Sequence, residues 1–321
     1  MNKGKVIVIT GPTASGKSEL GLYVAKEVGG EIVSADSMQI YRYMNIGTAK
    51  PSLKEQLSVP HHMIDIISPF DSYSAALYVK DAVSCIDGIH ERGKLPIIVG
   101  GTGLYIDSLI SARSFSPVSD DALRKSLEME YEQTSGKAML DKLKRFDEAS
   151  ANTLHENDKK RIVRAMEVYM LSGKTISVHD METKSIPPRY DVVKFALTYA
   201  NREILYEIIN KRVDIMLEMG LYGEVLKLIE MGVPSSSTAM QAIGYKEMFA
   251  VINGECELSI AVDKIKMETR RYAKRQLTWL RRDKDIKWLY KDDDGKGDVR
   301  LQLLSALDSV LKPSQCFENT P

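Results

Sequence analysis

The chain contains few cysteines and no long apolar segment. Its 321 residues include three cysteines, Cys85, Cys256 and Cys316, and no two of them form a C-x-x-C pair. This odd and scattered set provides no disulfide framework or zinc site, and it predicts reduced thiols in a cytoplasmic protein. No apolar run approaches the roughly 18 residues of a membrane helix. The first strand pattern begins at Val6, so we also expect no secretory signal peptide.

The chain also has no net charge. The 44 basic residues balance 44 acidic residues, so any affinity for a nucleic acid must come from local patches. The 44% hydrophobic and 27% charged residues are typical of a globular protein, and a chain of this length commonly divides into two lobes. His61 and His62 are adjacent, but no cysteine or carboxylate lies at ligand spacing from them. A structural or surface role is therefore favoured over a metal site.

Close to its N-terminus the chain does carry a phosphate-binding signature. The apolar run 6–10 leads into G-x-x-x-x-G-K-S, and a helical pattern begins at Ser18. In such a loop the backbone N–H groups surround a phosphate, the lysine adds a positive charge, and the serine hydroxyl can bind Mg²⁺. The strand before and the helix after distinguish this segment from a glycine turn without a ligand. The predicted diphosphate-binding residues are Gly11, Pro12, Thr13, Ala14, Ser15, Gly16, Lys17 and Ser18, with Ser18 as the metal ligand.

Strand and helix patterns alternate through most of the chain. They predict strands at 6–10, 31–34, 95–99 and 192–199, a terminal strand after Asp285, and helices at 18–28, 74–92, 202–219, 221–231, 258–282 and 299–311. Such alternation indicates an α/β fold, here a P-loop NTPase-like parallel sheet flanked by helices. The segment 116–189 is charged, helical in period and poor in strands, so we expect an all-helical insertion domain. The catalytic core then comprises 1–115 and 190–312, and 313–321 is a tail.

The second feature that a kinase or NTPase needs is missing. Such enzymes usually place a metal-binding aspartate at the end of another apolar strand, whereas the run 95–99 continues into GGTG at 100–103. That loop offers backbone N–H groups and the Thr102 hydroxyl, which suit a second set of hydrogen bonds to a diphosphate better than a metal-ligand role. Asp36 follows a different strand, and the sequence leaves two roles open for it: a displaced metal ligand or a base that faces an acceptor.

Two basic clusters follow in the later part of the chain. In the segment 264–282, Arg270/Lys274 and Arg271/Arg275 are like-charge pairs at i,i+4, which repel each other on a helix. A second cluster, KKRIVR, lies at 159–164 within the predicted insertion. Either cluster could be a solvated basic face, but two clusters on separate lobes fit a polyanion such as RNA better.

Seven segments together resemble one family, the bacterial tRNA dimethylallyltransferases, over essentially the whole chain. They are GPTASGKS at 11–18, SADSMQIYRYMNIGTAKP at 34–51, VPHHMIDI at 59–66, GGTGLYI at 100–106, NDKKRIVRAMEVYMLSGK at 157–174, QAIGYKE at 241–247 and RRYAKRQLTWLRRD at 270–283. One departure is Glu156, where relatives commonly have proline. We expect this difference to alter the entry of a helix and not the chemistry.

The resemblance implies transfer of a dimethylallyl group from dimethylallyl diphosphate to the exocyclic amine of the adenosine that follows the anticodon in tRNA. It implies Asp36 as the base, and Lys17, Thr102 and Arg212 as groups that stabilise the departing diphosphate with Mg²⁺ as cofactor. The implied partners are the tRNA anticodon stem-loop and the prenyl donor. We expect a monomer that does not bind membranes.

The resemblance also assigns tRNA contacts. They fall on Asp36, Ser37, Met38, Gln39, Thr102, Arg124, Lys160, Arg161, Ile162, Val163, Arg164, Gln241, Ala242, Ile243, Gly244, Tyr245, Lys246, Lys274, Arg275, Gln276, Leu277, Thr278, Trp279, Leu280 and Arg281. From the sequence, Trp279 and Tyr245 are as consistent with internal packing as with RNA contact. Three other functions remain as alternatives: an isopentenyltransferase acting on free AMP or ATP, a P-loop small-molecule kinase, and an RNA-binding protein without catalysis.

Overall fold

The computed structural model describes residues 3–112, 120–293, 295 and 297–311. The chain forms two compact units. The first, here called the sheet unit, consists of Met1–Leu109 and Tyr190–Pro321, and the second, the helical unit, of Ile110–Arg189. The sequence predicts the insertion at 116–189. The predicted tail, 313–321, lies outside the described residues.

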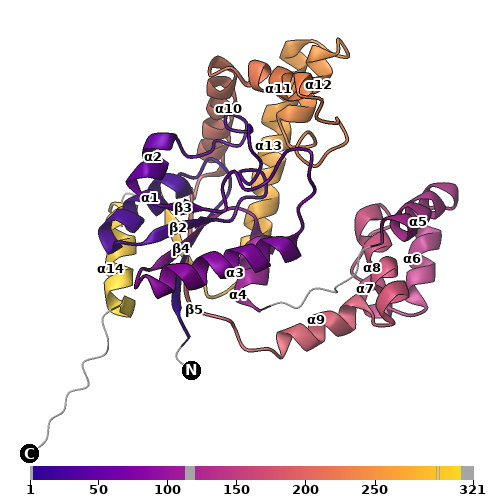
Figure 1. Ribbon diagram of the computed structural model, residues 1–321, viewed down its shortest axis with the longest axis horizontal. Coiled ribbons are helices and arrows are strands. Elements are labelled where there is room, and N and C mark those ends of the chain that lie inside the picture. The colour runs from indigo at the N-terminus through magenta and orange to yellow at the C-terminus, as the bar shows by residue number, and fades with distance from the viewer. Residues whose placement is uncertain (1–2, 113–119, 294, 296, 312–321) are drawn as a thin grey trace, which may run out of the picture. The chain divides into compact units, whose positions relative to one another are not determined.

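The sheet unit is built on one parallel sheet, as predicted (Figure 1). Its strands are β1 (Lys5–Thr10), β2 (Glu31–Ser34), β3 (His61–His62), β4 (Pro96–Gly100), β5 (Asp191–Thr198) and β6 (Lys287–Tyr290), in the order β3-β2-β4-β1-β5-β6. Every neighbouring pair is parallel, with Ile7 opposite Ile97 and Val193 on either side. The carboxyl ends of β2, β4 and β1 therefore meet at one edge of the sheet.

Nine helices of the sheet unit fall among the described residues. They are α1 (Lys17–Val28), α2 (Leu53–Ser58), α3 (Ala75–Glu91), α4 (Gly103–Ile110), α10 (Arg202–Glu218), α11 (Leu221–Glu230), α12 (Tyr245–Ile252), α13 (Leu258–Leu280) and α14 (Val299–Leu311). The long helices were predicted within a few residues. The short elements α2, α4, α12 and β3 were not predicted, because they are too short to show a hydrophobic period.

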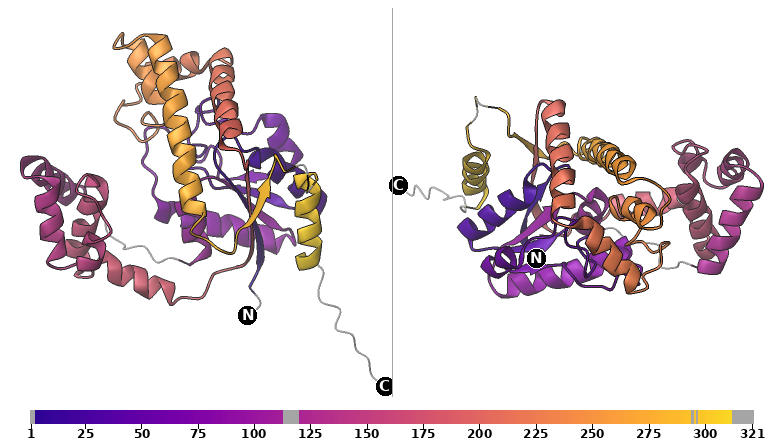
Figure 2. Two further views of the ribbon diagram at one scale, coloured as in Figure 1. Left: turned by 180° about the vertical axis from the view of Figure 1, so that it is seen from behind. Right: turned by 90° about the horizontal axis from the view of Figure 1, so that it is seen from above.

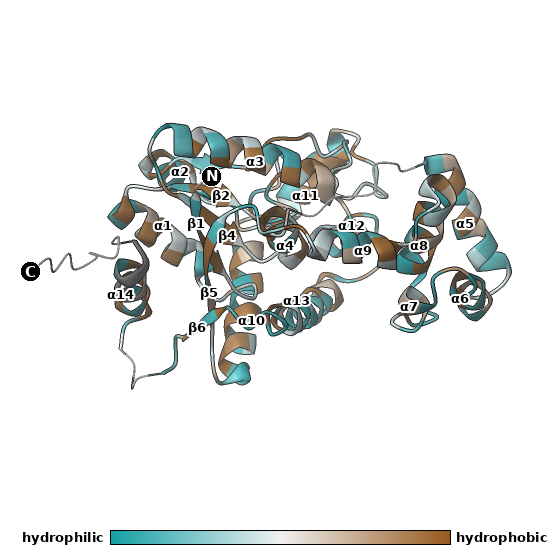
Figure 3. Cartoon of the chain, turned by 90° about the horizontal axis from the view of Figure 1, so that it is seen from below, coloured by the Kyte–Doolittle hydropathy of each residue, from teal (hydrophilic) through white to brown (hydrophobic). Residues whose placement is uncertain are grey.

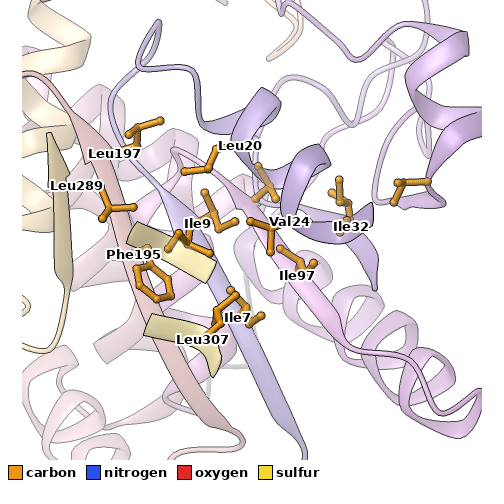
Figure 4. Packing of buried hydrophobic residues seen from close by; sticks show 14 residues of the cluster. Ile7, Ile9, Leu20, Val24, Ile32, Ile97, Phe195, Leu197, Leu289 and Leu307 are labelled. Atoms are coloured by element: carbon orange, nitrogen blue, oxygen red, sulfur yellow. The ribbon is translucent and has the colours of Figure 1, made fainter. Parts of the chain in front are cut away.

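One face of the sheet is covered by α1 and α14. Since successive strand residues point to opposite faces, Ile7 and Ile9 face the same side. There they pack with Leu20 and Val24 of α1 and with Leu307 of α14 (Figure 4). The central strands are correspondingly hydrophobic in Figure 3. This core fixes α1, and with it the loop that precedes α1.

A second core lies beyond the carboxyl edge of the sheet. Tyr41 and Met44, from the segment after β2, pack with Leu221 of α11, Tyr245 of α12 and Ile265 of α13. Helices α10 and α13 run side by side (Figure 2). This core places helical side chains opposite the loops that follow the strands.

The helical unit contains no strand among its described residues. Its helices are α5 (Asp121–Gln133), α6 (Gly136–Lys144), α7 (Glu148–Ala151), α8 (Lys159–Ser172) and α9 (Ile176–Lys184). They enclose a small core of their own, to which Leu127, Leu143, Ile162 and Met166 belong. Across the described part of the chain, no helix combines the length and apolar character that crossing a bilayer requires.

Candidate active site

The predicted phosphate loop connects β1 to α1 at the carboxyl edge of the sheet. Gly11 has a φ of 149°, and a Cβ there would lie 2.3 Å from the carbonyl oxygen of Leu197, so only glycine fits. Gly16, with a φ of 90°, turns the chain into α1, whose first residue is Lys17. The Lys17 Nζ donates to the carbonyl of Pro12 at 3.2 Å. The loop therefore has the left-handed turns and the helix N-terminus that phosphate binding requires.

Asp36 follows β2 at the same edge. One of its carboxylate oxygens, Oδ1, accepts hydrogen bonds from the backbone N–H groups of Met38 (2.9 Å) and Gln39 (3.3 Å). This turn fixes the direction of the side chain. The other oxygen has no hydrogen-bond partner among the described residues, and Asp36 lines the cavity described below. A carboxylate held this way can accept a proton.

Gln39, three residues further on, is buried, and its amide is used internally. Its Oε1 accepts from the Ser34 hydroxyl at 3.1 Å, and its Nε2 donates to the carbonyls of Thr48 (3.2 Å) and Ala49 (3.3 Å). The side chain thus holds the chain segment that follows it, although it also borders the cavity.

The sequence predicted that backbone N–H groups of the loop after β4 bind a diphosphate, but the N–H of Thr102 in this loop bonds within the protein. The Thr102 N–H donates to the carbonyl of Ala35 at 3.1 Å, so it is already occupied. A Cβ on Gly100 would lie 2.2 Å from that carbonyl oxygen, and one on Gly101 would lie 2.2 Å from the Gln276 amide nitrogen. These glycines therefore allow close packing. The Thr102 hydroxyl accepts from the Ser37 N–H at 3.1 Å, which leaves its own hydrogen to donate.

These loops border one cavity of about 350 Å³ in the sheet unit. Its polar lining includes Thr13, Lys17, Ser18, Asp36 and Arg212, and its apolar lining includes Ile32, Met38, Val99, Val213 and Met216. Thr102 lies beside this lining, through its bond to Ser37. Arg275 also lines the cavity. A cavity of this size, with three cations and a carboxylate against an apolar wall, fits a small ligand that has an anionic end and an apolar end.

Helices α10 and α13 supply the wall opposite the loops. The lining residues of α10 are Ile209, Arg212, Val213 and Met216, and those of α13 include Ile265, Thr269, Tyr272 and Gln276. The α10 residues have the spacing i, i+3, i+4, i+7 and the α13 residues the spacing i, i+4, i+7, i+11, so each set lies on one face of its helix. Arg212, which was assigned to the diphosphate only by resemblance, lies in the same cavity as Lys17. Tyr272 was missed in the sequence, although it shares a helical face with Gln276.

Gln276 ties the phosphate loop to the loop after β4. Its Oε1 accepts from the Thr13 N–H at 2.8 Å, and its Nε2 donates to the Gly101 carbonyl at 2.9 Å. The side chain is only 7% exposed. One residue of α13 thus sets the distance between two loops of the site.

Charge in the cavity is poorly solvated. Burial and, to a smaller extent, the nearby Arg212 lower the pKa of Lys17 to about 8, and Asp36 opposes the shift. Burial also lowers the pKa of Arg212, against the attraction of Asp36. Burial, assisted by Asp36, raises the pKa of Tyr272 to about 12, while its contact with the Thr102 hydroxyl works the other way. An anion between Lys17 and Arg212 would relieve the cost of their charges.

The donor set fits a magnesium ion only as part of a phosphate complex. No group of three histidine, cysteine or acidic side chains that could hold a metal occurs among the described residues. Mg²⁺ often uses one or two protein ligands and takes the rest from phosphate and water. Ser18 and Asp36 both line the cavity and could serve in that way.

His61 and His62 form β3 and bond to Val59 and Glu31, which agrees with the structural role predicted for them.

The outer part of α13 carries the predicted RNA-contacting cations. Lys274, Arg275, Thr278 and Arg281 are exposed, whereas Gln276, Leu277 and Leu280 are buried. The Trp279 Nε1 donates to the Asp107 carboxylate at 2.7 Å, and its ring lies against Gly103. Trp279 therefore packs beneath the basic surface, next to the loop after β4.

The predicted contacts at 241–246 lie in the connection between α11 and α12 and in the first turn of α12. Gln241, Ala242, Ile243, Gly244 and Tyr245 all line the cavity, and Gln241 is the exposed member. Tyr245 is fully buried, and its hydroxyl donates to Glu224 at 2.6 Å. Of the two roles that the sequence left open for Tyr245, internal packing and RNA contact, the structure shows internal packing. The Lys246 ammonium lies 3.5 Å from the Glu247 carboxylate.

The predicted contacts in the helical unit divide into two groups. Lys160 and Arg161 are exposed, whereas Ile162 and Val163 belong to the core of the unit, so no RNA can reach those two side chains in this arrangement. Three hydrogen-bond donors surround the fully buried Glu167. They are the guanidinium groups of Arg124 (3.0 Å) and Arg164 (2.7 Å) and the Asp120 N–H. Burial opposes ionisation of Glu167, but these bonds prevail and lower its pKa.

Comparison with known proteins places this geometry in a family. A family model described as "IPP transferase" matches residues 39–283, and one described as "Isopentenyl transferase" matches residues 4–65. A tRNA dimethylallyltransferase of Acetivibrio thermocellus is 49% identical, over 90% of this chain and 92% of its own length. The chain belongs to the tRNA dimethylallyltransferase family. The resemblance drawn from the motifs is thereby confirmed.

Other relatives and solved structures of the family agree over the whole chain. A tRNA dimethylallyltransferase of Carboxydothermus hydrogenoformans is 50% identical, over 91% of this chain and 93% of its own. A crystal structure of a tRNA isopentenylpyrophosphate transferase from Staphylococcus epidermidis is 42% identical, with a TM-score of 0.70, and the match covers 97% and 100% of the two chains. A eukaryotic dimethylallyltransferase acting on tRNA matches with a TM-score of 0.81 and 30% identity, over 99% of this chain and 82% of its own.

Proposed function

We propose that the cavity of this tRNA dimethylallyltransferase binds dimethylallyl diphosphate and an adenine base of tRNA, and that the prenyl group passes from one to the other inside it. The observation that carries this proposal is the meeting of Lys17, Arg212 and Asp36 in one partly apolar cavity. Two cations suit the leaving group, the carboxylate suits the acceptor, and the apolar wall suits the five-carbon group between them.

The donor half of the cavity stabilises departing charge. As the allylic C–O bond breaks, negative charge grows on the diphosphate oxygens, and Lys17 and Arg212 are already positioned to meet it. The backbone N–H groups at the start of α1 add their dipole. Ser18 would hold a Mg²⁺ ion here, and the ion would further neutralise this charge. Binding of the anion also favours the charged form of Lys17.

The acceptor half handles one proton. The exocyclic amine of adenine is a weak nucleophile because its lone pair is delocalised into the ring. As the new N–C bond forms, the amine loses a proton, and Asp36 accepts it through its unengaged oxygen. Asp36 therefore acts as the base, the second of the two roles left open by the sequence. Thr102 supports this region by holding Ser37, and its hydroxyl also contacts Tyr272.

The nucleic acid is held by exposed cations. The cavity is too small for a stacked helix, so the target adenosine must leave its stack to enter it. Lys274 and Arg281 on α13, and Lys160 and Arg161 on α8, are exposed and suited to phosphate contacts. Such contacts position the tRNA, while base contacts at 241–243 and around Asp36 select the adenosine.

One assay separates this function from its alternatives. Incubation with dimethylallyl diphosphate, Mg²⁺ and unmodified tRNA, followed by nucleoside mass analysis, should show one adenosine gaining a dimethylallyl group next to the anticodon. Parallel reactions offer AMP or ATP as acceptors, or ATP without a prenyl donor. Prenylation of the free nucleotide, or phosphate transfer alone, would contradict the proposal.

We also propose a monomer that acts in the cytoplasm. Cys85 and Cys256 are free thiols, as a reducing compartment requires. Light scattering coupled to size-exclusion chromatography tests the monomer, for which a mass near 36.0 kDa is expected. A mass of twice that value would contradict it.

A further inference from the structure

The side chain of Glu224, on α11, is surrounded by donors from another part of the sheet unit. Its carboxylate accepts hydrogen bonds from the backbone N–H groups of Asn45 (2.8 Å), Ile46 (2.9 Å) and Gly47 (3.2 Å). Three successive N–H groups that point at one place form an anion-binding concavity. Here the anion is supplied by the protein itself.

Tyr245, on α12, completes this arrangement from a third element. Its hydroxyl donates to Glu224 Oε1 at 2.6 Å, and the side chain is fully buried. Its ring also lies directly against Gly47, where a Cβ would come within 2.4 Å of a ring carbon. Glu224 and Tyr245 therefore hold the segment 45–49, here called the 45–49 loop, by charge on one side and by contact on the other.

The far end of the 45–49 loop is held from the strand side. The amide of Gln39 donates to the carbonyls of Thr48 and Ala49, and the Thr48 hydroxyl donates to the carbonyl of Met44 at 2.7 Å. The positive φ of Ala49, 45°, shows that the loop follows a path that few residues adopt without such support.

The 45–49 loop forms part of the wall of the active-site cavity. Gly47, Thr48 and Ala49 line it, together with Asp36 and Gln39. None of the groups that hold the loop belongs to the donor end, where Lys17 and Arg212 lie. The loop is thus fixed relative to Asp36 by contacts that are separate from the diphosphate site.

We propose that Glu224 is a positioning residue for the acceptor: by holding the 45–49 loop with Tyr245, it shapes the wall against which the adenine rests when its amine meets Asp36. This inference rests on the proposed function. It assigns no chemical step to Glu224. It predicts that loss of the Glu224 carboxylate lowers kcat/KM for tRNA and leaves the KM for the prenyl donor nearly unchanged.

The test uses the full-length protein with the variants Glu224→Gln and Tyr245→Phe. Glu224→Gln replaces an accepting oxygen with an N–H₂ group that faces N–H donors, and Tyr245→Phe removes one hydroxyl and keeps the ring. The matched control is Glu230→Gln, an exposed position on the same helix. We expect Glu224→Gln to lower kcat/KM for tRNA by about 10²-fold, because a misplacement of about 1 Å has effects of that order. We expect a smaller loss in Tyr245→Phe and an unchanged KM for dimethylallyl diphosphate in both.

Hydrogen–deuterium exchange gives a readout independent of activity. The N–H groups of Asn45, Ile46 and Gly47 should exchange faster in both variants, while those of α1 and the Glu230→Gln control keep their protection. Equal losses toward both substrates, or unchanged exchange at 45–47, would overturn the inference. If the unaltered protein failed to prenylate tRNA, the proposed function would fall, whereas the exchange result would still decide whether Glu224 holds the loop.

Discussion

Charged groups are used in opposite ways in the cavity of the sheet unit and in the core of the helical unit. In the sheet unit, Lys17 and Arg212 share a cavity with Asp36, yet no described carboxylate lies within ion-pair distance of either cation. In the helical unit, the buried Glu167 is matched by Arg124 and Arg164 at hydrogen-bond distance. The helical unit neutralises its buried charge, whereas the cavity of the sheet unit keeps its cations and its carboxylate apart.

This difference separates reactivity from stability. Unpaired buried cations destabilise the fold, and they remain where a ligand supplies the missing charge. A buried carboxylate with charged donors around it is satisfied and has nothing further to offer a ligand. Changes in the cavity should therefore alter activity at nearly constant stability, and changes around Glu167 should do the reverse.

The largest effect is expected from Asp36→Asn. The substitution keeps the size of the side chain and an oxygen for the N–H groups of Met38 and Gln39, but it removes the base. Turnover should fall by about 10²–10⁴-fold, the usual contribution of a general base. The fold and the tRNA affinity should persist. Single-turnover kinetics and a tRNA-binding assay check this, and near-normal turnover would remove Asp36 from the role of base.

Gln276→Ala should have the next largest effect. It leaves the Thr13 N–H and the Gly101 carbonyl without their partner, and the two loops can then shift relative to each other. We expect a loss of about 10–10² in kcat/KM for the donor, since misplacement of a site by about 1 Å costs up to that range. The control is Ser259→Ala at the exposed start of α13. A loss confined to the KM for tRNA would show that Gln276 contacts RNA instead.

Arg164→Ala tests the other side of the comparison. Glu167 would lose one of its charged donors while staying buried, which costs about 1–3 kcal/mol of unfolding free energy. Thermal unfolding measures this loss. The control is Arg161→Ala, because Arg161 lies on the same helix but is exposed, and its ion pair with Asp158, at 3.6 Å, is open to solvent. Turnover below the unfolding temperature should change little. Equal destabilisation by both variants would contradict the structural role of Arg164.

The sequence predicted the parallel sheet and the placement of the cavity loops because those features have local signals. A strand followed by GPTASGKS, and strands alternating with helices, already put the phosphate loop, Asp36 and Thr102 at one edge. The helical period of α13 was predicted. The like-charge pairs beside Tyr272 and Gln276 indicate only the outer, RNA-binding face, so the pattern gave no role in the cavity to Tyr272.

Pairing between distant residues could not be read in the same way. The cluster KKRIVR counts four cations, yet Arg164 is bound to Glu167 three residues later, and Ile162 and Val163 face a core that only the packing of α5, α6 and α8 creates. The glycines of GGTG suggested backbone donors, whereas in the structure they make room for Ala35 and Gln276. Glu224 had no recognisable pattern in the sequence, because the N–H groups that it accepts from, at 45–47, lie about 180 residues away.

The pH dependence of diphosphate binding sharpens the contrast between buried and exposed cations. Because the pKa of Lys17 is lowered to about 8, the empty site loses that charge as the pH rises through 8, well below the usual range for lysine. Pyrophosphate affinity of the unaltered protein should therefore fall by up to about tenfold per pH unit above 8, relative to Lys17→Arg, which stays charged. Calorimetric titration from pH 7 to 9.5 measures it, and parallel profiles for the two proteins would contradict the shift.

The same shift has a consequence for stability with the opposite sign. Between about 8 and 10.5, unfolded Lys17 binds a proton that the folded site does not. Unfolding then takes up protons, so the contribution of this group to stability rises with pH across that window.

The smallest effects are expected at the exposed cations. Lys274→Ala with Arg281→Ala, and separately Lys160→Ala with Arg161→Ala, should each weaken tRNA binding. Each pair should also reduce the slope of log K against log salt by about 0.7–0.9 for every phosphate that the variant no longer neutralises. Neither pair should change the unfolding temperature, since none of these side chains is buried. The control is Lys125→Ala on α5, which is exposed but lies outside both clusters.

Filter-binding assays at several salt concentrations distinguish the two surfaces. If the α13 pair lowers the slope and the α8 pair does not, the helical unit contributes fold and shape, and its exposed lysine and arginine are merely solvated. If both lower it, exposed cations of both units touch phosphate, and only the cations committed to Glu167 stand apart. An unchanged slope for both pairs would remove these surfaces from the tRNA-binding site altogether.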